Sequence, residues 1–310
     1  MLSTPDALTA ASALSLVEGR SRREWSLVFE SLRLIDVTWQ DLLRMQAIDA
    51  WKWLGWDAAS YRAWQSALDI ARARIGPAVE AGVAVVSGLD DDVPKWLLSL
   101  QAVPWVFYLG DISILDRKTL GFSGQREARD ESLAITAELA TEAARLGYAV
   151  VSGGARGIDI AAHTVALEAG GTTAVLLPQG LSTWRAPYAL ANPHHTDRVV
   201  ALSEDVPWEG WSTESAMRRN RMIVEISNVF TVPQSGTSGG SHSTGMYALK
   251  RGKVTYVPDL GADYPGNQKL LQHGARALAD GETGYDLEGM RIDSIPVKVP
   301  VQTSFASDLP

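Results

Sequence analysis

The chain has 310 residues, of which 46% are hydrophobic and 21% charged, values typical of a globular protein with a sizeable core. It contains no cysteine, which excludes disulfides, thiolate nucleophiles and cysteine-ligated metals. A net charge of -8 counts against a surface that coats nucleic acid throughout, but permits one basic groove on an acidic body.

Residues 1–20 lack the pattern of a signal peptide, and we expect a loose leader. No apolar run approaches the roughly 18 residues of a membrane span, so we expect a cytoplasmic protein. Over residues 21–82, apolar side chains at helical spacing predict a small helical domain. This domain holds Trp39, Trp51, Trp53, Trp56 and Trp64. They could form a base-stacking surface, but the favoured interpretation is that large side chains fill a limited core.

From residue 103 onward, apolar segments alternate with amphipathic ones. The predicted strands are 103–109, 119–123, 148–152, 172–177, 199–203, 229–233 and 253–257, and the predicted helices are 131–146, 158–169, 215–226, 241–250 and 268–278. Apolar strands separated by helices predict an α/β fold with a doubly wound, mostly parallel, Rossmann-like sheet over 83–285. Its ligand should lie beyond the carboxyl ends of the strands. We expect an extended tail over 286–310.

Four turns, over 121–126, 152–159, 217–223 and 234–244, are rich in glycine, serine and arginine. Glycine lets the backbone approach a ligand, amides at helix N-termini attract anions, and arginine pairs with phosphate. The turns therefore predict a phosphate-bearing ligand, either a nucleotide or a nucleic-acid backbone. The candidate binding residues are Ser123, Gly124, Gln125, Arg126, Ser152, Gly153, Gly154, Arg156, Gly157, Asn220, Arg221, Ser235, Gly236, Thr237, Ser243 and Thr244.

No turn matches the P-loop or the dinucleotide-binding pattern, so ATP hydrolysis and NAD-dependent chemistry are not supported and we expect no cofactor. Ser152, Asp159 and His163 could form a hydrolytic triad. Because Asp159 and His163 lie one turn apart on a predicted helix, we favour an aspartate that orients the loop and a histidine that bonds the sheet end. His194 and His195, with Asp197, could ligate a metal, but their Asn-Pro loop is typical of polar surface, and we expect no metal.

The segment 150–163 resembles the DprA/Smf family signature Ser-Gly-x-Ala-Arg-Gly-Ile-Asp-x-x-Ala-His. The segment 219–223 is similar to the family's Arg-Asn-Arg-x-Ile motif. Further similarities lie at 104–111, 174–181, 202–204 and 267–275. The resemblance covers about residues 80 to 285, after a helical N-terminal domain.

This resemblance implies a protein that binds single-stranded DNA in a positively charged pocket, forms a homodimer and delivers a RecA-type recombinase, without being an enzyme. It matches Arg126, Arg156, Asn220, Arg221, Ser235, Gly236 and Thr244 to the family's binding motifs. The chain departs from the family in Gln125, which stands where serine or threonine is usual, in an expanded last turn, and in a C-terminus without a winged helix. These departures suggest a divergent member that serves genome defence rather than transformation.

A different class of function stays open. The segment 233–237 resembles the Pro-Gly-Gly-x-Gly-Thr loop of phosphoribohydrolases in the wider superfamily, which would make the chain a nucleotide sensor or a nucleotide-cleaving enzyme. The glutamate that such enzymes need for acid–base chemistry is missing, because Ser238, Gly239 and Gly240 follow the loop. In a third interpretation, all four turns are structural and the protein is a scaffold.

Overall fold

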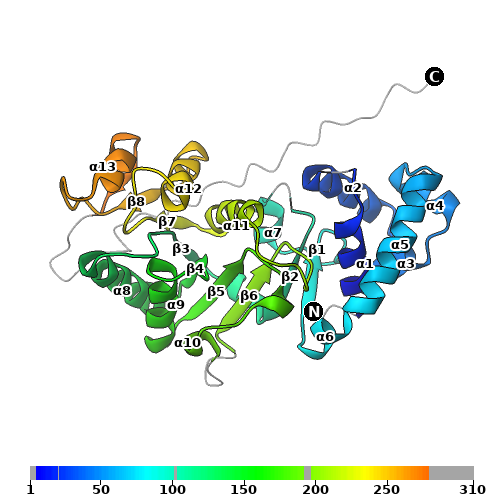
Figure 1. Cartoon of the computed structure of the whole chain (residues 1–310), viewed down its shortest axis with the longest axis horizontal. Coiled ribbons are helices and arrows are strands. Elements are labelled where there is room, and N and C mark those ends of the chain that lie inside the picture. Colours follow the sequence, from blue (N-terminus) through cyan, green and yellow to red (C-terminus); the bar gives the residue numbers. More distant parts are fainter. Residues whose placement is uncertain (1–4, 20, 101–102, 192–196, 279–310) are drawn as a thin grey trace.

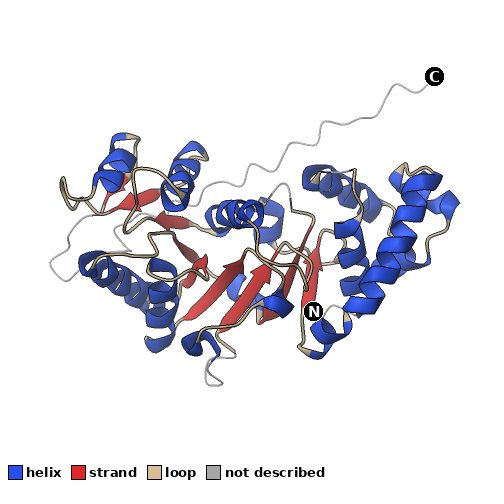
Figure 2. Ribbon diagram, in the orientation of Figure 1, coloured by secondary structure: helices blue, strands red, loops and turns tan. Residues whose placement is uncertain are grey.

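The computed structural model of the chain describes residues 5–19, 21–100, 103–191 and 197–278. Helices gather beside one end of a long sheet, and further helices cover its two faces (Figures 1 and 2). The N-terminal helices are α1 (Pro5–Leu16), α2 (Arg22–Leu34), α3 (Trp39–Arg44), α4 (Ala47–Leu54), α5 (Ala58–Arg74) and α6 (Gly76–Glu80).

The strands are β1 (Ala84–Ser87), β2 (Trp105–Gly110), β3 (Thr119–Phe122), β4 (Ala149–Gly153), β5 (Thr172–Leu177), β6 (Val199–Ser203), β7 (Val229–Thr231), β8 (Thr255–Val257) and β9 (Arg276–Ala277). The helices between them are α7 (Lys95–Ser99), α8 (Asp130–Arg145), α9 (Ile158–Glu168), α10 (Tyr188–Ala191), α11 (Thr213–Ile226), α12 (Gly240–Lys250) and α13 (Pro265–Gln272). Two short 3-10 helices, η1 (Ile112–Asp116) and η2 (Leu181–Thr183), complete the described elements.

The strands form one sheet in the order β1-β2-β6-β5-β4-β3-β7-β8-β9. Every pair from β6 to β9 is parallel, whereas β2 runs antiparallel to β6 and β1 antiparallel to β2. The predicted doubly wound, mostly parallel α/β fold is confirmed. The strand order reverses between β3 and β7, because the chain builds outward from β3 to β6 and then returns. Ligands of such folds bind at this switch point, outside the carboxyl ends of the strands.

Alternating residues of the central strands pack on opposite faces of the sheet. Val150 of β4 lies in the core under α8 and α9, whereas Val151 lies in the core under α11, α12 and α13. All residues of β4 and β5 are buried, as expected for parallel strands covered on both faces. This double burial explains why the strand predictions agree with the structure to within two residues at each end.

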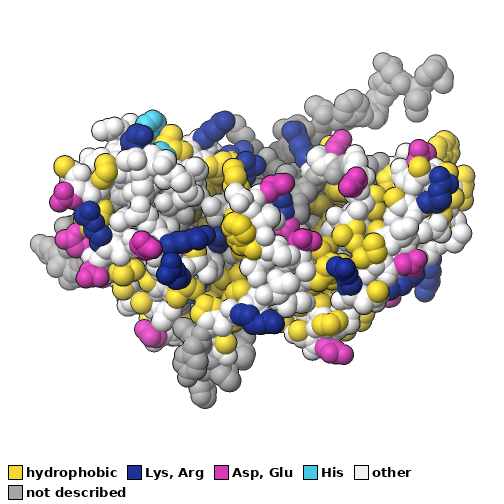
Figure 3. Space-filling view, in the orientation of Figure 1, with side chains coloured by type: hydrophobic (Ala, Val, Ile, Leu, Met, Phe, Trp, Pro, Cys, Tyr) yellow, Lys and Arg dark blue, Asp and Glu magenta, His cyan; other side chains and the backbone are white. Residues whose placement is uncertain are grey.

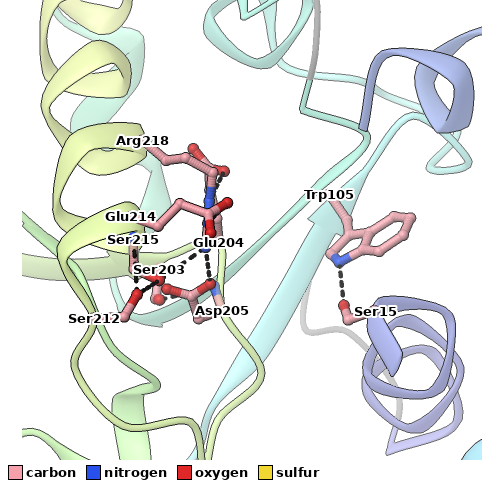
Figure 4. A network of polar contacts seen from close by, with 9 residues as sticks. All are labelled: Ser15, Trp105, Ser203, Glu204, Asp205, Ser212, Glu214, Ser215 and Arg218. Atoms are coloured by element: carbon pink, nitrogen blue, oxygen red, sulfur yellow. Dashed lines mark hydrogen bonds and ion pairs between the residues drawn. The ribbon is translucent and has the colours of Figure 1, made fainter. Parts of the chain in front are cut away.

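The N-terminal helices join the sheet in one continuous core. Trp25 and Phe29 of α2 pack against Trp105 of β2, with ring centroids 6.2 and 5.3 Å apart. The Trp105 indole donates a 3.1 Å hydrogen bond to the Ser15 hydroxyl of α1, which Figure 4 shows. The predicted domain boundary at 82–83 lies between α6 and β1, but the packed interior runs across it.

The prediction of a loose leader over residues 1–20 was wrong where the structure describes it. Residues 5–16 form α1, whose Leu8 and Leu14 are each 1% exposed. This helix packs against α5 and is apolar nearly all round, so it has no polar stripe to reveal its period in the sequence. The interpretation that the tryptophans fill the core is confirmed for Trp39, Trp56 and Trp64, which are buried, but is wrong for Trp51, which is 63% exposed.

The predicted helix over 268–278 was also wrong at its end. Helix α13 stops at Gln272, and Gly274 follows with a left-handed φ of +100°, which only glycine adopts readily. Arg276 and Ala277 then pair with β8 as a short parallel strand. The predicted tail over 286–310 lies outside the described residues. Among the described helices, none is both long and apolar enough to cross a membrane.

The contact between the N-terminal helices and the sheet predicts a contrast between two tryptophans. Trp105 is 3% exposed, so Trp105→Ala should lower the free energy of unfolding by about 3–5 kcal/mol through the cavity it leaves. Trp51 is 63% exposed, and Trp51→Ala should change it by less than about 0.5 kcal/mol. Urea unfolding of both variants measures the difference, and equal effects would contradict the continuous core.

Candidate nucleic-acid interface

The loops after β3 and β7 are tied together at the switch point. The backbone amide of Ser123 donates to the Thr231 carbonyl over 3.1 Å, and that of Gln125 donates to the Gln234 carbonyl over 3.1 Å. The side-chain amide of Gln234 donates to Gln125 Oε1 over 2.7 Å, and its oxygen accepts the Arg129 backbone amide over 2.8 Å. The Gln125 side chain therefore bonds the neighbouring loop. This contact gives a structural reason for a glutamine at the position where the family usually has serine or threonine.

The turn after β4 packs directly on the loop after β3. Gly157 has a φ of +80°, and a Cβ there would lie 2.4 Å from the Gln125 carbonyl oxygen and 2.6 Å from that of Arg126. The Ile158 amide donates to the Gln125 carbonyl over 3.3 Å, and the buried Ser152 hydroxyl donates to the Phe122 carbonyl over 2.8 Å. Only glycine fits at position 157, so the close approach of the two loops depends on it.

A buried ion pair lies beneath these loops. Arg219 of α11 is 8% exposed, and its Nη1 lies 3.8 Å from Asp159 Oδ2 of α9 and donates to the Leu176 carbonyl over 3.3 Å. Asp159 also accepts the Ala155 amide over 3.3 Å, as the sequence predicted for a loop-orienting aspartate. Burial raises the pKa of the Asp159 carboxyl, and the Arg219 charge opposes that rise. The pair fixes the β4–α9 turn to α11.

Arg219 was not among the predicted site residues, although it lies in the matched motif. The signal that could have found it is helical spacing: positions 219, 222, 223 and 226 are all buried on one face of α11. An arginine in that stripe must have a buried partner, because an unpaired charge in the interior is very costly. Asp159 was the available carboxylate.

Among the arginines at this edge, Arg126, Arg129, Arg156 and Arg221 are exposed. Arg156 Nη2 lies 3.9 Å from Glu127 Oε1, and both side chains are at least 80% exposed, so this pair is weak and leaves the guanidinium accessible. Figure 3 shows a group of dark-blue side chains over β3 and β4. An acidic protein thus presents basic side chains at the edge where a ligand is expected.

Two further arginines of α11, Arg218 and Arg221, contact other side chains of the protein. Arg218 forms ion pairs with Glu204 and Asp205 after β6 and with Glu214 of α11, and Figure 4 shows this network. The network fastens the start of α11 to the end of β6. The guanidinium of Arg221 lies 5.9 Å from the Tyr247 ring centroid, on the side of α11 that faces α12.

The last loop meets the same edge. A Cβ on Gly236 would lie 3.1 Å from Gln125 Nε2, and one on Gly240 would lie 3.8 Å from Asn220 Nδ2. Helix α12 begins at Gly240 with no side-chain cap and no acidic residue in its first turn, which leaves its amides and dipole available to an anion.

The predicted residues of this loop differ in their exposure. Thr237 and Ser243 are exposed on the surface. The Ser235 hydroxyl donates to the Gly236 carbonyl over 2.8 Å, and the Thr244 hydroxyl donates to the Gly240 carbonyl over 2.7 Å. Among the predicted residues after β3 and β4, Gly124 and Gly154 are half-buried and Ser123, Ser152 and Gly153 are buried.

His163 is part of the interior and does not meet Ser152. Its Nε2 lies 2.8 Å from the Gly153 carbonyl, which can only accept, so Nε2 carries the proton. Its Nδ1 contacts the Thr173 hydroxyl. With the Ser152 hydroxyl bonded to a carbonyl, these side chains form no hydrolytic relay. The histidine pair at 194–195 lies outside the described residues, and within the described ranges no cluster of three or more His, Asp or Glu residues could hold a metal.

A family model described as DNA recombination-mediator protein A matches residues 84–286. The chain belongs to this family. Membership in the recombination-mediator A family confirms the predicted DprA/Smf resemblance and the predicted role in DNA processing, and it does not favour the nucleotide-cleaving alternative.

Individual relatives agree with this membership. DprA of Bacillus subtilis is 30% identical over 214 residues, which cover 67% of this chain and 72% of that protein. The X-ray structure of Streptococcus pneumoniae DprA shares the fold, with a TM-score of 0.66 over 89% of this chain and 95% of that one at 21% identity. A Helicobacter pylori DprA structure matches with a TM-score of 0.57 at 26% identity, over 67% of this chain and 93% of that one.

The position of Arg219 predicts that replacing Gly153 lowers the stability of this recombination-mediator family member. A Cβ on Gly153 would lie 1.3 Å from Arg219 Nη1, whereas the nearest atom to one on Gly154 is 3.4 Å away. Gly153→Ala should lower the free energy of unfolding by about 1–3 kcal/mol, and Gly154→Ala should leave it nearly unchanged. Chemical denaturation measures both, and a tolerated Gly153→Ala would contradict the placement of Arg219.

The buried histidine predicts a loss of stability in acid. Burial lowers the pKa of His163 to about 4, below its usual value near 6.5, so its contribution is present above pH 6.5 and is lost as the pH falls toward 4. The loss should reach roughly 3 kcal/mol between these limits. Denaturation of wild type and His163→Gln at pH 7 and pH 4.5 isolates this group, and a similar acid loss in both would refute it.

Proposed function

We propose that the carboxyl edge of the sheet at the β3–β7 switch point binds single-stranded DNA, with phosphates at Arg126 and Arg156. The observation that carries this proposal is the convergence of three loops, after β3, β4 and β7, which hydrogen bonds and close glycine contacts hold together. The related DprA of H. pylori has a single-stranded DNA binding mode. The likeness supports the same ligand here.

The parts of the edge have different roles in this proposal. Arg126 and Arg156 supply mobile charges to the backbone phosphates, while the uncapped start of α12 supplies backbone amides. Arg219 stays beneath the surface, paired with Asp159, and holds the β4–α9 turn in place without touching the DNA. Because the rest of the protein is acidic, we expect the strand to follow the loops and not to spread over the body.

Three further elements complete the proposal, and the family's description as a recombination mediator supports the first of them. We propose that the bound strand is passed to a RecA-type recombinase, that the protein works as a homodimer, and that it acts in the cytoplasm. Sedimentation of the purified chain tests the dimer, and strand exchange with a recombinase tests the transfer.

The phosphate contacts can be counted by fluorescence anisotropy with labelled oligo-dT over a range of salt concentrations. For single strands the slope of log affinity against log salt is about -0.7 per neutralised phosphate. Arg126→Ala with Arg156→Ala should therefore weaken binding and make the slope shallower by about 1.4. Arg145→Ala is a matched control, because Arg145 ends the 16-residue helix α8, roughly 24 Å from its start.

Two results would overturn the proposal. One is an absence of oligonucleotide binding by the wild type at low salt. The other is a double arginine variant that binds with wild-type affinity and slope. Calorimetric binding of mononucleotides by a wild type that does not bind oligo-dT would instead support the nucleotide-sensor alternative.

A further inference from the structure

A cleft lies next to the switch point and is separate from the glycine-rich loops. It has a volume of about 380 Å³ and is lined by Arg129, Asp130, Glu131, Leu260, Asp263 and Tyr264, which come from the start of α8 and the segment after β8. We call it the Arg129 cleft. None of these residues belongs to the motifs from which the phosphate-binding edge was predicted.

The side chain of Arg129 lies over a buried aromatic ring. Its guanidinium carbon lies 4.8 Å from the centroid of the Tyr264 ring, and Tyr264 is 4% exposed whereas Arg129 is exposed. The Tyr264 hydroxyl donates to Glu131 Oε2 over 2.7 Å, which holds the ring in place. Cation–π attraction favours this placement of the guanidinium. The guanidinium is thus held over an aromatic ring and lines the cleft while remaining exposed.

The cleft is also directly coupled to the proposed phosphate contacts. The Arg129 amide donates to Gln234 Oε1, and Gln234 in turn bonds the side chain of Gln125. Arg126 precedes Arg129 by three residues, which span at most about 11 Å. A strand whose phosphate lies on Arg126 can therefore place an adjacent base at the cleft.

We propose that the Arg129 cleft is a nucleobase subsite that favours bases with an exocyclic amino group, an inference that rests on the proposed binding of single-stranded DNA. Unstacked bases stack on guanidinium planes, so Arg129 can hold any base. Carboxylates accept hydrogen bonds from the N4 amino group of cytosine, a group that thymine lacks. Asp130 and Asp263 supply such acceptors at the rim.

The charge of the cleft argues against its other occupants. Three carboxylates and one guanidinium give it a net negative charge, which repels phosphate and keeps the DNA backbone outside. A cationic side chain from a protein partner would pair with the carboxylates but would leave the guanidinium plane without a stacking partner. A neutral, flat base with amino donors satisfies both the guanidinium plane and the carboxylates.

The experiment compares oligo-dC with oligo-dT by fluorescence anisotropy. Wild type should bind oligo-dC several-fold more tightly. Arg129→Lys keeps the charge but removes the plane, so it should weaken binding of both oligonucleotides by about fivefold or more without changing the salt slope. Arg145→Lys is the matched control and should change neither. Asp130→Ala with Asp263→Ala should abolish the preference for oligo-dC without weakening oligo-dT.

The possible outcomes separate this inference from the proposed function. If Arg126→Ala with Arg156→Ala weakens binding but Arg129→Lys does not, the nucleobase subsite is wrong and the phosphate edge stands. Because lysine would keep a phosphate contact, the slope is also measured in Arg129→Ala, where a slope shallower by about 0.7 would make Arg129 a phosphate ligand. Equal affinity of wild type for both oligonucleotides would remove the base preference. Binding of a lysine-rich peptide that requires Asp130 and Asp263 would assign the cleft to a protein partner. Failure of wild type to bind either oligonucleotide overturns both proposals.

Discussion

The buried guanidinium of Arg219 is the contact on which the ligand edge depends. It lies against Asp159 at the start of α9 and occupies the space that a side chain at Gly153 would need. Removing either charge would leave the other unpaired in the interior, which is far more costly than losing a surface ion pair. The glycine at position 153 is therefore required by the packing of Arg219, independently of any ligand that the turn binds.

The glutamine contact between the loops after β3 and β7 has a comparable role at the surface. Gln234 reaches Gln125 on one side and the Arg129 amide on the other, so it sets the spacing between the proposed phosphate contacts and the Arg129 cleft. Where the family usually carries a small hydroxyl residue, this chain carries one half of an amide pair. In this chain the glutamine pair links the two loops.

The sheet could be predicted from the sequence because its parallel strands are buried on both faces and appear as short continuous apolar runs. The position of the four loops at one edge could also be predicted, because the carboxyl ends of parallel strands lie on the same side of a sheet. Helix α1 and strand β9 escaped prediction for opposite reasons: α1 has no polar face, and Arg276 and Ala277 are too few and too exposed to produce a strand pattern. The sequence motif could not assign different roles to Arg218, Arg219 and Arg221. These arginines differ in their burial and in their contacts, which only the structure shows. The Arg129 cleft joins segments about 130 positions apart and has no local signature.

The aromatic contact of Trp25 and Phe29 with Trp105 packs the N-terminal helices against the sheet in one continuous core. A molecule bound by those helices would therefore be held in one orientation relative to the carboxyl edge of the sheet. A shortened chain that begins at β1 would expose the aromatic face of β2 to water and would tend to aggregate. The helical region thus belongs to the same packed structure as the sheet, even though the matched family segment starts only at residue 84.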